Sequence, residues 1–301
     1  MKRFAKTSLN LAAETAKYRR FWLLDVLIAI LLLLIAELAS MGLFLPFNLV
    51  QYFVQKPLIS SEWSILLRSS LSFGCLLFIC VLYCILIDKR SLAGIGFVRK
   101  NIIKEYGLGF LIGGTMISAS VFLCILSGTA QIMEFSFRFS WSILLYLLMF
   151  LVQGMAEEVL CRGFLMLSIA NRYRPIVAIT INSALFMLLH IMNSGLTPLA
   201  FLNLFLFGCF ASVYLWKRGN IWGIGALHSA WNFFQGNMFG ILVSGNAFGP
   251  SVLSTELSES AVWFNGGAFG LEGGLAVTIT LVISLSILLL IPVRKSILVN
   301  S

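Results

Sequence analysis

The chain has 301 residues, of which 59% are hydrophobic and only 11% are charged. Because a soluble domain carries about 25% charged residues, this composition excludes an ordinary soluble protein and predicts an integral membrane protein with little mass outside the bilayer. The net charge of +9 does not indicate nucleic-acid binding, since the basic residues lie in short clusters between hydrophobic segments, as membrane topology favours.

Apolar segments long enough to cross a bilayer recur along the whole chain. About 20 mostly apolar residues span the hydrocarbon core as a helix. We therefore predict an all-α, polytopic membrane fold with about eight transmembrane helices. The predicted helices cover about 21–45, 64–87, 106–128, 140–169, 175–193, 198–216, 220–242 and 272–292.

The basic residues mark one side of the membrane. Six precede the first helix, within residues 1–20, and five lie between the second and third helices. The alternate connections contain almost none, and the Gly/Ser-rich loop 243–271 contains none. Because Lys and Arg concentrate in cytoplasmic loops, both termini are predicted to be cytoplasmic and loop 243–271 extracytoplasmic.

Three polar clusters interrupt the hydrophobic segments in the second half of the chain. They are Glu157-Glu158 with Arg162, then His190, then His228 with Asn232, and they include both histidines of the chain. An ionisable side chain at the centre of a bilayer costs roughly 2.5–3.5 kcal/mol, so such residues are expected to have a function. Two carboxylates, two imidazoles and an amide suffice to activate a water molecule and to stabilise an oxyanion.

Helix geometry places these clusters at similar depths. With a rise of about 1.5 Å per residue, Glu157 and His190 lie roughly 20 and 22 Å from the cytoplasmic ends of their predicted helices. His228 and Asn232 lie roughly 12 and 18 Å deep on theirs. We therefore predict that the three clusters form one shared site.

The spacing also predicts which side chains face that site. Glu158 and Arg162 are four residues apart with the acid first, the favourable order for a helical ion pair. This pair is expected to be structural, which leaves Glu157 free to face the site. His228 and Asn232 are also four apart and share a helix face.

The three motifs are Glu-Glu-x-x-x-Arg at 157–162, Phe-x-x-x-His at 186–190 and His-x-x-x-Asn at 228–232. In this order on successive hydrophobic segments, they resemble the CPBP family, the type II CAAX prenyl endopeptidases and their bacterial relatives associated with bacteriocin processing and immunity. The resemblance covers about residues 141–235. It implies an intramembrane endopeptidase with an eight-helix fold.

The same resemblance implies a role for each motif residue. Glu157 and His190 would bind and activate the attacking water, and His228 and Asn232 would stabilise the oxyanion. The supporting residues would be Glu158, Arg162 and Phe186.

The chain then divides into five regions. These are a basic cytoplasmic N-terminus (1–20), three membrane helices (21–140), a CPBP-like catalytic core (141–242), an extracytoplasmic loop (243–271), and a last helix with a basic C-terminus (272–301).

The sequence leaves the use of a metal open. Glu157, His190 and His228 could form a zinc triad with a water in the fourth position, and Glu158 could then be the base. Their spacing differs from the local His-Glu-x-x-His signature of zinc proteases. The resemblance also implies a metal-independent glutamate mechanism, which we prefer, with zinc as the alternative.

Two other functions fit the same residues. One is a non-catalytic membrane scaffold or bacteriocin self-immunity protein, and the other is a proton-coupled transporter that uses Glu157, His190 and Glu37 as a relay. Every motif position is occupied, which favours the protease. The expected partners are membrane lipid and a lipidated protein, peptide precursor or membrane-protein substrate reached from the bilayer or the cytoplasmic side. The expected location is a bacterial plasma membrane.

Overall fold

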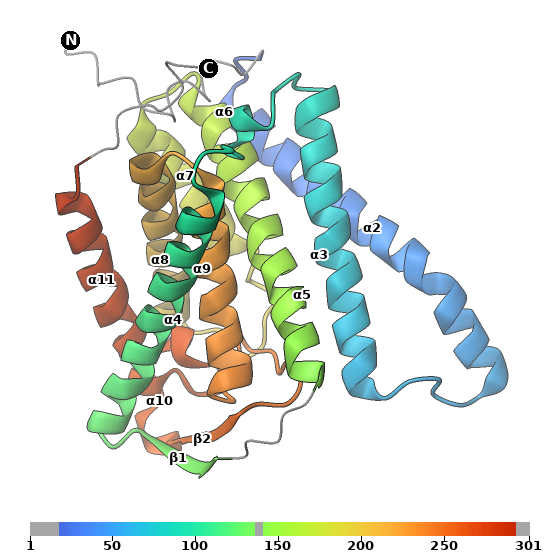
Figure 1. The fold of residues 1–301 in the computed structure, drawn as a ribbon, viewed down its shortest axis with the longest axis vertical. Coiled ribbons are helices and arrows are strands. Elements are labelled where there is room, and N and C mark those ends of the chain that lie inside the picture. The colour runs from blue at the N-terminus through green and yellow to red at the C-terminus, as the bar shows by residue number, and fades with distance from the viewer. Residues whose placement is uncertain (1–17, 136–140, 293–301) are drawn as a thin grey trace.

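The computed structural model describes residues 18–135 and 141–292. Within these ranges the chain forms a bundle of mostly apolar helices with a small two-stranded sheet at one end (Figure 1). At the opposite end of the bundle α2 begins and α11 ends. Of the predicted terminal regions, residues 1–17 and 293–301 lie outside the described residues, as does position 140, the predicted start of the fourth helix.

The elements follow one another along the chain as a helical series interrupted by the two strands. The α-helices are α2 (Trp22–Val54), α3 (Ser61–Leu86), α4 (Ile102–Leu126), α5 (Trp141–Glu158), α6 (Leu167–Ala170), α7 (Pro175–Leu188), α8 (Pro198–Arg218), α9 (Ile221–Phe233), α10 (Val262–Asn265) and α11 (Leu275–Leu290). The π-helical segments are η2 (Val159–Met166) and η3 (Phe234–Met238). The 3-10 turns are η1 (Ala93–Ile95), η4 (Glu259–Ala261), η5 (Gly267–Phe269) and η6 (Leu271–Gly273), and the strands are β1 (Ala130–Phe135) and β2 (Leu253–Leu257).

The prediction of a mostly α-helical membrane fold is confirmed. In the part of the chain that the structure describes, five helical stretches are long and apolar enough to cross a membrane. They are Trp22–Val54, Ser61–Leu86, Ile102–Leu126, Trp141–Ala170 and Pro198–Arg218, and α7 and α11 are shorter apolar helices. The number of eight spans and the cytoplasmic side of the termini stay predictions.

Local sequence signals explain several helix boundaries. Pro198 is the first residue of α8, where its missing N–H has no helical partner to lose, and the hydroxyl of Thr197 accepts a hydrogen bond from the backbone N–H of Ala200 at 3.1 Å. Gly219 ends α8 with a φ of 73°, a left-handed conformation that glycine adopts at no steric cost. Asn220 then caps the start of α9.

The predicted ends of two helices are wrong. The apolar pattern predicts that the first helix ends at about 45, but α2 continues to Val54 through the polar Asn48, because a helix does not have to stop where its apolar composition does. The same pattern predicts that the fifth helix reaches 193, but α7 ends at Leu188. His190 therefore lies in the turn that follows α7 and not on the helix itself.

Loop 243–271 is more ordered than predicted. It contains β2, η4, α10 and η5, and β2 pairs antiparallel with β1, with Ala130 opposite Leu257. The prediction missed this sheet because its two strands are more than a hundred residues apart in the sequence, so no local pattern indicates the pairing.

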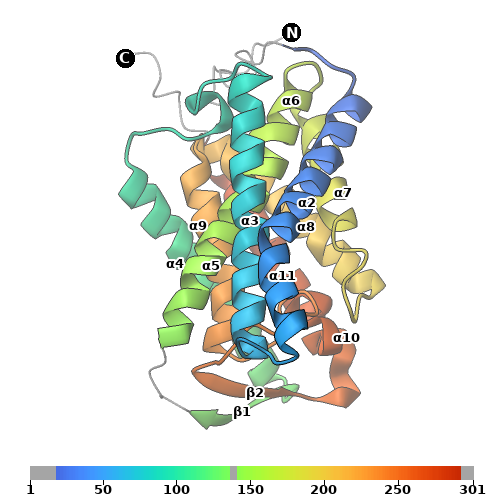
Figure 2. The ribbon, with the colours of Figure 1, turned by 90° about the vertical axis from the view of Figure 1, so that its right-hand side faces the viewer.

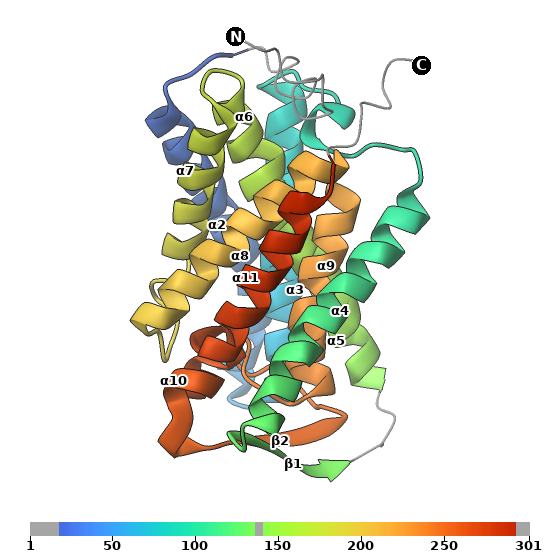
Figure 3. The same cartoon turned by 90° about the vertical axis from the view of Figure 1, so that its left-hand side faces the viewer.

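Glycines allow α4 and α9 to pack in close contact (Figure 3). A Cβ atom on Gly109 would lie 1.9 Å from the carbonyl oxygen of Gly223, and one on Gly113 would lie 2.1 Å from the carbonyl oxygen of Leu227. Small residues one turn apart commonly permit such approach between membrane helices. Because Leu227 precedes His228, this contact also fixes the helix that carries the third motif.

We predict that Gly113→Ala destabilises the protein by about 1–3 kcal/mol, the usual cost of overpacking, and displaces α9. Gly107 is the matched control, since it lies on the same helix and a Cβ there would meet no atom within 4 Å. Gly107→Ala should be neutral or stabilising by up to about 1 kcal/mol. Thermal unfolding of both variants in detergent checks this, and equal melting temperatures would contradict it.

A buried ion network ties together the end of the bundle where α2 begins. Arg20 bridges Asp25, at 3.5 Å, and Asp88. Arg90 donates to Asp88 at 2.9 Å and also contacts the hydroxyl of Ser168. The network joins the start of α2, the end of α3 and α6. Figure 2 shows α2 and α3 side by side in front of the other helices.

Candidate active site

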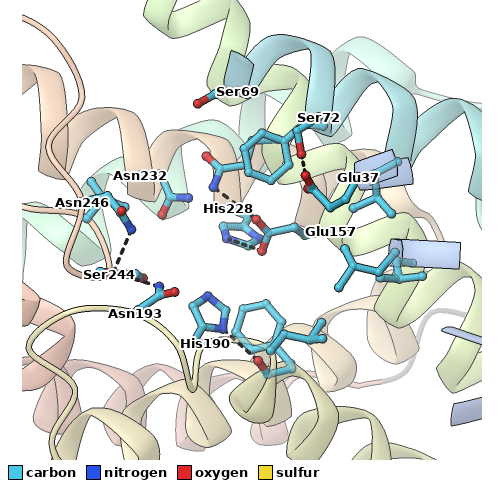
Figure 4. Close-up of a pocket in the computed structure, with 18 of the residues that line it drawn as sticks. Glu37, Ser69, Ser72, Glu157, His190, Asn193, His228, Asn232, Ser244 and Asn246 are labelled. Carbon is cyan, nitrogen blue, oxygen red and sulfur yellow. Dashed lines mark hydrogen bonds and ion pairs between the residues drawn. The ribbon is translucent and has the colours of Figure 1, made fainter. Parts of the chain in front are cut away.

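A cavity of about 840 Å³ lies between α2 and α3 on one side and the rest of the bundle on the other. Glu157, His190, His228 and Asn232 all line it. Figure 4 shows these four side chains around one open space. The structure thus brings the three sequence motifs together, although they lie on separate helices and, for His190, on a turn.

Glu157 lies in the last turn of α5, immediately before Glu158 and the π-helical segment η2. Its side chain is partly exposed to the cavity. The side-chain amide of Gln153, one turn earlier, donates to Oε1 of Glu157 at 3.1 Å. Oε2 lies 3.8 Å from Nε2 of His228, which is too long for a hydrogen bond. One carboxylate oxygen is therefore held and the other remains open.

Glu158 and Arg162 form the predicted ion pair. Their closest atoms are 2.8 Å apart and both side chains are fully buried. Arg162 also donates to the carbonyl oxygen of Gly208 at 3.3 Å, and its guanidinium lies over the ring of Phe186, 4.6 Å from the centroid. A buried ion pair needs such additional partners to offset the cost of desolvation.

This ion pair also orients His228. Nδ1 of His228 lies 3.0 Å from Oε1 of Glu158, the oxygen that accepts from Arg162. The imidazole ring contacts the rings of Phe207 and Phe186, with centroids 5.0 and 5.9 Å away. With Nδ1 directed at Glu158, Nε2 faces the cavity and Glu157. The spacing predicts the ion pair but not that it holds the histidine.

His190 is held by its own backbone turn. Nδ1 lies 2.9 Å from the carbonyl oxygen of Phe186, and because a carbonyl oxygen only accepts, Nδ1 must carry the proton. In the neutral ring Nε2 then has a free lone pair. Figure 4 shows this ring on the other side of the open space from Glu157. A water molecule in that space could donate one hydrogen bond to the Glu157 carboxylate and one to Nε2 of His190.

Comparison with known proteins agrees with the motifs. Residues 139–234 match the family model described as Type II CAAX prenyl endopeptidase Rce1-like. This part of the chain is therefore similar to Rce1-like domains and is called the Rce1-like domain below. The resemblance to the CPBP family is confirmed, and at the level of the family the domain supports a CAAX-type intramembrane protease. No curated protein and no solved structure matches the chain.

The arrangement in the Rce1-like domain does not fit the zinc triad considered from the sequence. Among residues 18–135 and 141–292, no three His, Cys, Asp or Glu side chains lie close enough together to hold a metal ion. Glu157 and His228 face each other, but His190 lies apart from them and its Nδ1 is engaged by a backbone carbonyl. We therefore propose no catalytic step through a metal, and a chelator tests whether the protein uses zinc.

Two acids outside the Rce1-like domain also line the cavity. Glu37, the third member of the possible proton relay, accepts a hydrogen bond from the hydroxyl of Ser72. Glu272 is buried and its Oε2 accepts from the backbone N–H of Ser244 at 2.6 Å and from Gln235 at 3.3 Å. No motif assigns a role to Glu272, which is the first residue of the predicted last helix, and its partners are distant in the chain.

The two helices α5, which carries Glu157 and Glu158, and α9, which carries His228 and Asn232, both continue as π-helix. η2 follows directly on Glu158, and η3 begins two residues after Asn232. π-helical turns are rare and occur frequently at functional sites. A π-helical turn is wider than an α-helical one, so it shifts the direction in which the following side chains point. All eight residues of η2, including Arg162, are buried. The apolar periodicity of the sequence does not distinguish such a turn from an α-helix.

Proposed function

We propose that this protein is an intramembrane endopeptidase of a bacterial plasma membrane, in which Glu157 and His190 activate a water molecule and His228 and Asn232 stabilise the oxyanion. The observation that carries the proposal is the single cavity that all four side chains line. Peptide-bond hydrolysis needs a base, an oriented water and hydrogen-bond donors, and these residue types can provide all three.

The proposed reaction begins with a water held between Glu157 and Nε2 of His190. Glu157 removes a proton while the water oxygen attacks the carbonyl carbon of the scissile bond. When the tetrahedral intermediate collapses, the C–N bond breaks and Glu157 returns the proton to the leaving amine. Gln153 would keep Glu157 oriented through the bond to Oε1. No serine or cysteine nucleophile is required.

The oxyanion would form beside His228 and Asn232, one turn apart on α9. The side-chain amide of Asn232 donates through its N–H groups, and His228 donates through Nε2 when both ring nitrogens carry protons. Because Glu158 and Arg162 fix the ring, these donors are oriented before the substrate binds. Preorganised donors of this kind stabilise a transition state more than flexible ones.

Asn232→Ala is expected to lower kcat by roughly 10²- to 10³-fold with little change in KM, as for loss of one oxyanion donor. Asn193→Ala is the matched control, since Asn193 also lines the cavity but donates to the carbonyl oxygen of Ser244. Steady-state kinetics of both variants make the comparison. An unchanged kcat for Asn232→Ala would remove this residue from the mechanism.

The proposed function is tested by cleavage assays with the purified protein in liposomes. The substrates are lipidated and unlipidated C-terminal peptides and secreted peptide precursors, each incubated with wild type and His190→Ala, with and without a chelator. Cleavage by wild type that His190→Ala loses and the chelator leaves intact supports the glutamate mechanism. Cleavage abolished by the chelator and restored by zinc would overturn the metal-independent step.

A scaffold or self-immunity protein gives a different result. Wild type would then cleave no peptide, and Glu157→Ala and His190→Ala would still complement a cell lacking the protein. That pair of observations would end the protease proposal.

A further inference from the structure

The cavity lies towards one end of the bundle. It extends along each helix only part of the way towards the end of the bundle where α2 begins. On every helix the lining residue nearest that end is still well short of it. On α2 that residue is Leu33, roughly 16 Å from Trp22, and on α3 it is Leu76, roughly 15 Å from Leu86. His228 is roughly 10 Å from the start of α9.

Packed side chains fill the space between the cavity and that end. Cys80, Cys84, Phe164 and Leu165 are completely buried there. The ion network of Arg20 joins the surrounding helices at the same level. Apart from α3, the contacts of α2 fall mainly on η2 and α6, both at this end. The cavity is therefore closed on this side.

At the other end α2 separates from the rest of the bundle. The buried face of α2 runs from Asp25 to Phe44, and no later residue of α2 within its described length is buried. Tyr52 and Phe53 are 75% and 78% exposed. Figure 1 shows this end of α2 lying away from the rest of the bundle. The cavity is thus bounded by a hairpin of which α2 is fixed at one end and free at the other. The partner helix α3 stays packed on α5 at the free end, where Tyr146 donates to the carbonyl oxygen of Glu62 at 3.1 Å.

Polar groups of the cavity extend towards this free end. Asn48 and Arg68 line it on the hairpin, and Asn193, Ser244 and Asn246 line it on the connections that follow α7 and η3. The walls nearer the closed end are apolar, with Leu33, Leu76 and Leu281 among them. A path lined by polar side chains therefore runs from the site towards the free end.

The charge distribution assigns a side of the membrane to each end. The connections at the closed end, together with the adjoining helix ends, contain Lys89, Arg90, Arg99, Lys100, Lys104, Arg172, Arg174, Lys217 and Arg218. At the free end, the connections between α2 and α3 and between α7 and α8 contain Lys56 alone. By the positive-inside rule the closed end is cytoplasmic and the free end is extracytoplasmic.

We propose that the cavity is loaded from the extracytoplasmic side, and that its occupant is a polypeptide segment that has already crossed the membrane. This departs from the expectation that the substrate is reached from the bilayer or the cytoplasmic side. The nature of the occupant rests on the proposed protease function, whereas the direction of the opening rests on the structure and the charge distribution alone.

The direction is tested with single cysteines in a chain whose six native cysteines are replaced by alanine. The probe is a small, membrane-impermeant thiosulfonate that carries a sulfonate, applied to right-side-out and to inverted vesicles. Ser69→Cys reports on the cavity, since Ser69 lines it two turns inside α3. If that variant does not fold, Asn48→Cys, which lines the cavity on α2, takes its place.

Three control cysteines show which side of the membrane the probe reaches in each type of vesicle. Lys100→Cys marks the cytoplasmic surface and Ser260→Cys the extracytoplasmic surface, and Ser286→Cys marks the exposed outer face of α11 within the bilayer. We expect Ser69→Cys to react at least tenfold faster in right-side-out vesicles and Ser286→Cys to react in neither. Faster reaction in inverted vesicles, or no reaction of the cavity cysteine from either side, would overturn the proposal.

A second arm separates this inference from the proposed function. Peptides are supplied to one side of vesicles that contain the wild-type protein in one orientation. Cleavage only from the extracytoplasmic side supports both proposals. Cleavage only from the cytoplasmic side overturns the inference and leaves the protease. A cavity cysteine that reacts from outside, with no cleavage from either side, keeps the direction of the opening and overturns the protease.

Discussion

Glu157→Gln is expected to lower kcat for peptide cleavage by roughly 10²- to 10⁴-fold, the usual contribution of a general base. Glutamine has nearly the same shape as glutamate and can still contact Gln153, but it cannot accept the proton of the attacking water. The effect should therefore fall on kcat, with KM little changed. Single-turnover cleavage in liposomes measures the chemical step directly.

Glu37→Gln is the matched control for this prediction. Glu37 is a second carboxylate that lines the same cavity, but it is hydrogen-bonded to Ser72 on the α2–α3 hairpin and belongs to no motif. Its replacement should leave kcat within a few-fold of wild type. If both variants lost activity equally, the cavity charge in general and not the base at position 157 would explain the effect.

Arg162→Met is expected to lower the free energy of unfolding by about 3–5 kcal/mol, the cost of leaving one partner of a buried ion pair without the other. Arg162 and Glu158 are both fully buried, so no water can replace the lost contact. Without Arg162 the carboxylate of Glu158, which holds the ring of His228, is no longer fixed, and kcat should fall as well. Chemical unfolding in mixed micelles measures the stability change.

Two comparisons identify the cause of that loss. Arg218→Met removes a partner of Glu105, but Arg218 is 23% exposed, so its guanidinium is partly solvated in the folded protein and the loss of stability should be smaller. Combining Arg162→Met with Glu158→Gln removes both charges and should recover part of the stability, since a neutral buried pair is tolerated. A double variant as unstable as Arg162→Met would attribute the effect to packing against Phe186.

Much of the site could be predicted because membrane helices are regular. A rise of about 1.5 Å per residue is enough to place Glu157 and His228 at compatible depths from the sequence alone. The i,i+4 spacing likewise predicts the pair of Glu158 and Arg162, which the structure contains. In these cases the regular rise and turn of a single helix determine where the side chains lie.

The remaining features depend on contacts that no local pattern encodes. The apolar run of α7 extends past its end at Leu188, so the turn that carries His190 could not be recognised from composition. The bond of Glu158 to His228 spans 70 residues, and the contacts of Glu272 join it to Gln235 and Ser244. Each requires the packed arrangement of several helices to be known first.

The walls of the cavity come from two different parts of the chain. The family match covers 139–234, which includes every motif residue, whereas the hairpin of α2 and α3 and the segment from Val243 to Leu281 lie outside it and supply much of the lining. Substitutions in these outer segments would alter the shape and polarity of the cavity without touching the proposed catalytic groups. If the proposed function holds, the hairpin would therefore set which substrates are accepted, and the matched domain would set the reaction.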